Sequence, residues 1–103
     1  MIRITLIQKE NELEQIKLKG HAMYDDYGKD IVCAGVSSIL TTTVNAILKF
    51  SKEAITFEDQ NDEFVLTINQ KDEITKKLIA NMVELFYELE DSYPKNITIR
   101  KRG

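Results

Sequence analysis

Cysteine and histidine are nearly absent from the chain, which has one of each among its 103 residues. A lone cysteine cannot form an internal disulfide, which excludes a small secreted scaffold held together by disulfides. One cysteine and one histidine also cannot complete a structural zinc site unless carboxylates or a second subunit contribute ligands. We therefore expect neither a metal nor another cofactor.

Basic residues are fewer than acidic residues in this chain. The chain has 14 Lys and Arg residues against 17 Asp and Glu residues, which gives a net charge of −3. Nonspecific nucleic-acid binding draws most of its affinity from phosphate neutralisation, so this balance argues against broad capture of nucleic acid. It also gives no reason to expect binding to a membrane surface. The residues from Met1 to Thr5 lack the organisation of a signal peptide. With the single cysteine, these features predict a cytoplasmic protein.

Charge is missing altogether from residues 31–48. A membrane-spanning helix needs about 20 predominantly apolar residues. This run contains several hydroxyl and amide side chains, which suit lipid poorly: Ser37, Ser38, Thr41, Thr42, Thr43 and Asn45. We expect a helix buried in a soluble core.

The strands are predicted by alternation of apolar and polar residues. Residues 2–6 and 14–18 alternate, and the polar residues 9–12 between them indicate a hairpin that ends at Gly20. Residues 54–58 and 63–68 predict a second hairpin around residues 60–62. Ile97 and Ile99 predict a short last strand before a basic tail.

Two aspartates mark the expected helix starts, because aspartate is a preferred N-cap. Asp30 is expected to begin a helix that runs to about Phe50. The β-branched residues of this segment favour a strand, but the segment is too long for a buried strand, so we expect a helix. Asp72 is expected to begin a second helix, which ends before Pro94. Its predicted apolar stripe consists of Ile74, Leu78, Met82, Leu85, Phe86 and Leu89. Lys76, Lys77, Glu84, Glu88 and Glu90 are expected on its wet side.

The resulting order is ββαββαβ, an α+β fold with two helices packed on a mainly antiparallel sheet. At this length we expect one domain, residues 1–103. The second helix could use its apolar stripe for the core or equally for a homodimer interface.

Cys33 has two interpretations. If Asp30 is the N-cap, Cys33 is the third helical residue, and the unpaired N–H groups and dipole of a helix start stabilise a thiolate there. A free cysteine in an apolar run is also a common packing residue. His21 follows Gly20 at a predicted strand end and precedes the helix, so a Cys–His pair is sterically natural, although a histidine in a turn needs no function.

One segment resembles a known family. Gly20-His21-Ala22 is followed by Tyr27-Gly28-Lys29-Asp30-Ile31-Val32-Cys33-Ala34-Gly35-Val36-Ser37, with 12 residues from His21 to Cys33. This pattern is similar to that of the bacterial ribosomal-processing cysteine proteases, the Prp or YsxB-like family. The resemblance also covers the length, the element order and the later Val44-Asn45.

The resemblance implies a cysteine protease with a Cys33–His21 dyad. It implies removal of a short N-terminal extension, next to a pair of phenylalanines, from the large-subunit ribosomal protein L-twenty-seven. It also implies a homodimer. As a mechanism, we expect His21 to take the thiol proton and the thiolate to form an acyl-enzyme. Backbone N–H groups of Cys33 or Ala34 at the helix start are expected to hold the oxyanion.

Several neighbouring residues have open roles. Asp30 could cap the helix or orient His21 by its charge. Ser37, one turn after Cys33, belongs to the site by resemblance, or its hydroxyl bonds its own backbone. Residues 22–29 form a candidate lid with Gly20 and Gly28 as hinges. Tyr24 and Tyr27 in it are expected to pack on the phenylalanines of the substrate.

A binding module is the alternative class of function. The basic residues Lys95, Arg100, Lys101 and Arg102 could dock on ribosomal RNA without catalysis. The chain has no glycine-clamp loop and no aromatic stacking pair on a strand, both of which are common in single-strand RNA binding. A basic tail is more often simply solvated, so the protease hypothesis needs no direct contact with nucleic acid.

Overall fold

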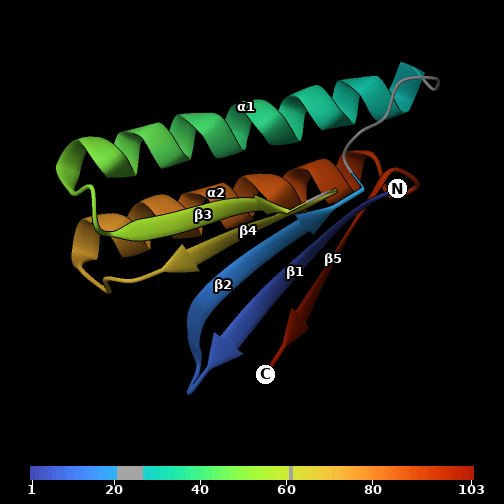
Figure 1. Ribbon diagram of the computed structural model, residues 1–103. Helices are drawn as coiled ribbons and strands as arrows, with labels where there is room; N and C mark the ends of the chain where they lie inside the picture. The colour runs from blue at the N-terminus through green and yellow to red at the C-terminus, as the bar shows by residue number, and fades with distance from the viewer. Residues whose placement is uncertain (21–26, 61) are drawn as a thin grey trace.

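The computed structural model describes residues 1–20, 27–60 and 62–103. Its elements follow the predicted ββαββαβ order, and both helices lie on one side of a mixed sheet (Figure 1). The elements are β1 (Ile2–Lys9), β2 (Glu12–Lys19), α1 (Tyr27–Phe50), β3 (Ile55–Gln60), β4 (Glu63–Ile68), α2 (Glu73–Ser92) and β5 (Ile97–Arg102). The α+β class is therefore confirmed.

The sheet has the strand order β3-β4-β2-β1-β5. The β1–β2, β2–β4 and β3–β4 pairs are antiparallel, whereas β1 and β5 are parallel. The sheet is thus mainly antiparallel, as predicted. The basic residues expected as a tail after residue 99 are part of β5, where Arg100 and Arg102 lie beside Thr5 and Ile7.

The first hairpin closes through Glu10 and Asn11, whose φ angles are 55° and 65°. Two consecutive residues with positive φ are typical of the type I′ turn, whose twist matches that of the flanking strands. The register shifts between Ile7 and Gln8, so the hairpin contains a bulge near its tip. This hairpin directs the far end of β2, at Lys19, back toward the chain start.

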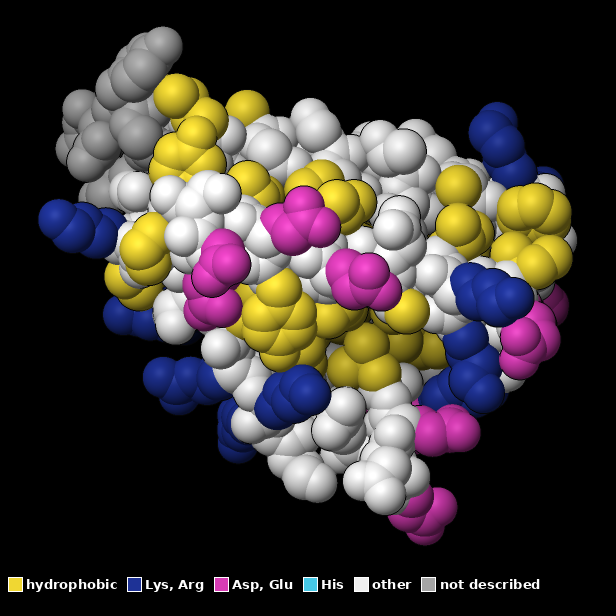
Figure 2. Space-filling model, turned by 180° about the vertical axis from the view of Figure 1, so that it is seen from behind, with side chains coloured by type: hydrophobic (Ala, Val, Ile, Leu, Met, Phe, Trp, Pro, Cys, Tyr) yellow, Lys and Arg dark blue, Asp and Glu magenta, His cyan; other side chains and the backbone are white. Residues whose placement is uncertain are grey.

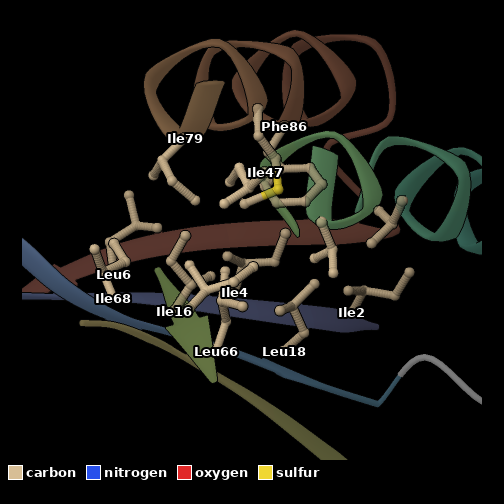
Figure 3. Packing of buried hydrophobic residues seen from close by; sticks show 14 of the residues in the cluster. Ile2, Ile4, Leu6, Ile16, Leu18, Ile47, Leu66, Ile68, Ile79 and Phe86 are labelled. Atoms are coloured by element: carbon tan, nitrogen blue, oxygen red, sulfur yellow. The ribbon is translucent and has the colours of Figure 1, made fainter. Parts of the chain in front are cut away.

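One hydrophobic core fills the space between the sheet and the helices (Figure 3). Alternate residues of β1 and β2 point into it, as the period of two requires. Phe86 of α2 and Ile47 of α1 meet these strand residues from above in Figure 3 and are at most 1% exposed. The largest fully buried side chains among the described residues are Ile2, Ile4, Ile16, Leu18, Val32, Ile47, Leu66, Met82, Phe86 and Ile97.

Asp72 caps α2 as predicted, because its carboxylate accepts hydrogen bonds from the backbone N–H and the hydroxyl of Thr75, both at 2.9 Å. These bonds allow Thr75 to be buried, and the buried side of α2 continues through Ile79, Met82 and Phe86. The predicted stripe is therefore wrong at its start, since Ile74 is exposed.

The prediction that Glu90 lies on the wet side of α2 is also wrong. Its side chain is half-buried and accepts the backbone N–H of Ile99 at 2.8 Å. A strand at the edge of a sheet leaves alternate backbone N–H groups unpaired, and Glu90 satisfies one of them. This bond ties the end of α2 to β5.

The uncharged helix α1 is not enclosed by the core, contrary to expectation. Only 28% of the 18-residue apolar window within Ile31–Phe50 is buried, and Ile31 and Phe50 are exposed. Within the described part of the chain this helix has the length and composition of a membrane span, which is weak evidence because core helices pass the same test. One face, with Val32, Val36 and Ile47, packs on the core. Over residues 31–48 the opposite face has no charge and faces outward.

Candidate active site

Gly20 fixes the end of β2 directly before His21. Its φ is +79°, and a Cβ atom added to it would lie 2.6 Å from the carbonyl oxygen of Met1. A residue with a side chain would meet both the left-handed backbone penalty and this contact. Glycine is therefore required where the chain leaves the sheet. His21 itself and Tyr24 lie outside the described residues, so their predicted roles stay predictions.

Cys33 is half-buried on α1 and packs against the hydrophobic core beside the fully buried Val32. The expected helix start at Asp30 is wrong, because α1 begins at Tyr27. Asp30 is thus inside the helix and Cys33 lies in its second turn. An aspartate also stands directly before Tyr27 in the sequence, so aspartate alone does not fix the start.

This earlier start changes the electrostatic argument for the thiolate. The stabilising effect of a helix terminus falls off within the first turn. In a continuous helix each backbone N–H beyond the first turn donates to the carbonyl four residues earlier. The predicted oxyanion donors, the N–H groups of Cys33 and Ala34, are therefore committed to the helix in this structure. The helix start therefore gives Cys33 less electrostatic stabilisation than the sequence predicts.

The predicted substrate loop is also shorter than residues 22–29. Tyr27 and Gly28 belong to the first turn of α1, so Gly28 is not a hinge between a loop and a helix in this structure. Glycine normally weakens a helix interior, and this explains why the sequence pattern favoured a loop there.

A hollow of about 150 Å³ lies one turn beyond Cys33. It is open between α1 and the sheet, where β2 approaches the point at which it leaves the sheet. Ser37 is exposed at this hollow, and Ala34 is exposed on the preceding turn. The lining residues are Leu18, Val36, Ser37, Leu40, Thr41 and Phe64. Mostly apolar walls with two hydroxyl groups suit an apolar side chain held next to a polar backbone.

The end of β2 and the Cys33 helix thus meet at one place. Leu18, two residues before Gly20, and Val36, three residues after Cys33, line the same hollow. The sequence predicts this proximity of strand end and helix. Phe64 and Leu40 were not predicted as lining residues. For Phe64 the reason is that nothing in the sequence indicates that β4 pairs with β2 and brings Phe64 opposite Leu18.

No group of three or more metal-ligating side chains occurs among the residues that the structure describes. Around Cys33 the described residues offer the thiol itself and, one turn later, the hydroxyl of Ser37.

The family model for "Cysteine protease Prp" matches residues 1–98. The chain belongs to the cysteine protease Prp family. A curated relative from Staphylococcus aureus strain Mu50, the ribosomal processing cysteine protease Prp, is 28% identical over 96 residues, covering 90% of this chain and 91% of the relative. The protein of the same name from Bacillus subtilis strain 168 is 33% identical over 49 residues, covering 47% of this chain and 44% of that protein.

Solved structures agree with the Prp assignment at the level of fold. The essential ribosomal processing protease Prp of S. aureus in complex with a substrate peptide matches with a TM-score of 0.90 and 24% identity, over 99% of this chain and 100% of that one. SMU.848 from Streptococcus mutans matches with a TM-score of 0.82 and 27% identity, over 98% of this chain and 93% of that one.

Membership of the Prp family makes the protein a cysteine protease. A cysteine protease needs a cysteine nucleophile, and the chain has one cysteine. The chain is accordingly better described as a protease than as a non-catalytic binding module.

Proposed function

We propose that the protein is an endopeptidase that removes the short N-terminal extension of the large-subunit ribosomal protein L-twenty-seven, with Cys33 as nucleophile and His21 as base. The observation that carries the proposal is the junction at Gly20. Its positive φ and its approach to Met1 determine where β2 ends, and the only histidine follows at once. The hollow beyond that strand end is shared with the helix of the only cysteine.

In the proposed reaction His21 takes the proton from the Cys33 thiol. The thiolate forms a bond to the scissile carbonyl carbon, and the protonated His21 then gives its proton to the leaving amine. Water, deprotonated by His21, hydrolyses the thioester and releases the acid. Because the backbone N–H groups of Cys33 and Ala34 are used within α1, the Ser37 hydroxyl is the better candidate donor to the oxyanion.

The hollow fits the apolar part of the proposed substrate. Its walls are formed by Leu18, Leu40 and Phe64, and aromatic rings pack well on such surfaces. We propose that one phenylalanine of the extension enters it while the adjacent peptide bond lies over Cys33. A relative from S. aureus whose structure contains a substrate peptide carries the name of a ribosomal processing protease, which supports a ribosomal protein as substrate.

Incubation of the purified protein with the extension-bearing ribosomal protein, read by mass spectrometry, tests the substrate. We expect one cut next to the phenylalanine pair, with no product from Cys33→Ala. A substrate in which both phenylalanines are replaced by alanine is the control and should be cut at least tenfold more slowly. Equal cleavage of both substrates would reject the assignment of the hollow, whereas no cleavage of either would reject the substrate.

The supporting role of Ser37 has an internal control in its neighbour. Ser37 lines the hollow near Cys33, whereas Ser38 lines a different depression with Asn81 and Leu85 of α2. Loss of one oxyanion donor lowers kcat about 10²–10³-fold. We expect a loss of that size in kcat for Ser37→Ala with little change in KM, and near wild-type values for Ser38→Ala. Equal kcat values for the two variants would remove Ser37 from the site.

Asp30 is no longer a candidate cap, so its remaining proposed role is electrostatic. Positions 30, 33 and 37 are separated by three and four residues and therefore share one side of α1. Asp30→Asn removes the charge at almost constant volume. We expect it to lower kcat/KM and to shift its acidic limb to lower pH, since a nearby carboxylate favours protonated histidine. A pH profile identical to that of the wild type would show that the charge is dispensable.

We further propose that the protein works as a homodimer in the cytoplasm. The buried side of α2 is used by the core through Ile79, Met82 and Phe86, so α2 does not supply a second apolar face. The outward face of α1 does, since residues 31–48 carry no charge and only a minority of the helix is buried. Burial of that face against a second copy is the favoured arrangement, because large exposed apolar surfaces are uncommon in monomers.

A further inference from the structure

The sheet has one face without a helix, and its charges are unevenly distributed. Side chains alternate between the two faces along each strand. Ile4 and its cross-strand partners Leu18 and Ile99 point toward the core, so the residues next to them in each strand point outward. The outward positions of β5, β1 and β2 carry five cations, which we call the basic face: Arg3, Lys17, Lys19, Arg100 and Arg102. Near the hairpin turn Lys9 lies opposite Glu12, so this pair is left out of the basic face; the other outward positions of the three strands in the paired registers are not acidic.

The pairing registers bring these cations together. Arg3 lies directly opposite Lys19, and Thr5 lies between Lys17 on one side and Arg100 on the other. Like charges directly opposite each other on a sheet are destabilising. The fold therefore keeps an arrangement of charges that does not help its own stability.

Neighbouring acids form no ion pair with this face among the described residues, and only its edge at Lys19 meets a carboxylate across the sheet. The ion pairs of the described residues are Lys71–Glu14 and Lys77–Glu73, and neither involves the basic face. The nearest outward carboxylate in the register is Glu63, opposite Lys19 on β4, and Glu58 follows on β3. Figure 2 views the molecule from the helix side, with acidic side chains at the centre of that view; the helix-free face of the sheet lies on the far side. The charge is thus local, although the whole chain has a net charge of −3.

We propose that the basic face binds the phosphate backbone of folded, double-stranded RNA. The cations are spread over three strands, which suits a broad polyanion better than a single acidic peptide running along one edge. Three of the five are arginines, whose planar guanidinium binds phosphate in a bidentate manner. Thr5 and Thr98 stand between them and add hydroxyl donors.

The composition of the face also indicates which form of RNA it fits. Single-stranded RNA is usually held by bases stacked on aromatic side chains. The sequences of β1, β2 and β5 contain no aromatic residue. Backbone contacts without stacking are typical of double-stranded RNA recognition, which depends on shape rather than on sequence.

This proposal is independent of the protease reaction, and a binding assay without substrate tests it. Fluorescence anisotropy with a labelled RNA hairpin of about 16 base pairs, the span of a double-strand binding domain, is measured over a series of salt concentrations. We expect wild-type affinity to fall with salt and to be the same for two hairpins of unrelated sequence. The triple variant Arg3→Gln, Arg100→Gln, Arg102→Gln should bind at least tenfold more weakly. Its log–log salt slope should be smaller by about two to three, at 0.7–0.9 for each lost phosphate contact.

A matched variant removes three positive charges elsewhere. Lys49→Gln, Lys52→Gln, Lys77→Gln gives the same net charge from exposed lysines outside the basic face and should bind RNA like the wild type. Equal weakening in both triple variants, no hairpin binding by the wild type, or displacement of the hairpin by an equal concentration of a poly-glutamate 15-mer would each overturn the proposal. Cleavage of a short peptide substrate should be unchanged in the Arg variant, which separates a failure here from a failure of the proposed protease function.

Discussion

Gly20 is the residue on which the geometry of the candidate site most depends. A left-handed backbone costs a residue with a side chain about 1–2 kcal/mol, and the Met1 carbonyl oxygen would lie 2.6 Å from the new Cβ. We predict that Gly20→Ala lowers the free energy of unfolding by at least about 1 kcal/mol and also lowers kcat/KM, because the chain must shift directly before His21. Urea denaturation and peptide cleavage measure the two effects.

Gly35 is the matched control for that substitution. It lies within α1, where a Cβ would be 3.4 Å from Cδ1 of Leu89, a flexible side-chain end. Alanine in a helix interior is favoured over glycine by up to about 1 kcal/mol. Gly35→Ala should therefore leave stability unchanged or raise it. Equal destabilisation by the two substitutions would show that the backbone at Gly20 is not special.

At the level of the element, the cap of α2 makes a pH-dependent contribution to stability. Hydrogen bonds from the backbone N–H of Thr75 and then from its hydroxyl hold the pKa of the Asp72 carboxyl below its ordinary value of 3.8. A carboxyl whose pKa is lower in the folded state stabilises the fold above its unfolded pKa, and this contribution is lost as the pH falls through the folded pKa. The loss therefore occurs below about pH 4.

Asp72→Asn isolates this contribution because asparagine is also a good N-cap. We predict that the melting temperature of the wild type falls more between pH 5 and pH 2.5 than that of Asp72→Asn. Differential scanning calorimetry at both pH values gives the comparison, with all other carboxyl groups shared by the two proteins. Parallel declines would mean that the hydrogen bonds to Thr75 do not favour the charged form.

The elements differ in how far the sequence could predict them. The strands followed from alternation because each has one buried face, and Asp72 was identified because its capping chemistry is local. The first helical residue of α1 was misplaced by four residues, at residue 31 instead of Tyr27, since Gly28 favours a loop and two aspartates could cap the helix. The prediction that backbone N–H groups of Cys33 or Ala34 hold the oxyanion depended on Cys33 lying in the first turn. The earlier start of α1 therefore removes the basis of that prediction.

Long-range arrangement was beyond the sequence pattern. The parallel pairing of β5 with β1 depends on contacts 95 residues apart, such as Ile2 with Ile97, and nothing local encodes it. Absence of charge also predicted too much burial for α1, because hydroxyl-rich helices tolerate water as well as a core. The hollow near Cys33 could not be predicted either, because it depends on a long-range strand pairing that places Phe64 of β4 across from Leu18.

At the level of the whole molecule, the exposed uncharged side of α1 makes the proposed dimer testable. Asn45 is exposed on this helix, away from the hollow near Cys33. We predict that Asn45→Lys weakens the dimer at least tenfold in sedimentation velocity over a concentration series, because two like charges would be brought into a largely apolar contact. Ser92→Lys, an exposed change at the end of α2, is the control and should leave the dimer intact. A wild-type monomer at every concentration would rule the dimer out.

The central claim is that His21 activates Cys33, and the alkylation rate of the thiol tests it most directly. The chain has one cysteine, so intact mass after reaction with iodoacetamide reports on Cys33 alone. The thiolate is the reactive form, and His21→Ala removes the group that takes the proton. We predict that the second-order rate at pH 7 falls by about an order of magnitude in folded His21→Ala. An alkylation rate equal to that of the wild type, at unchanged melting temperature, would contradict the dyad.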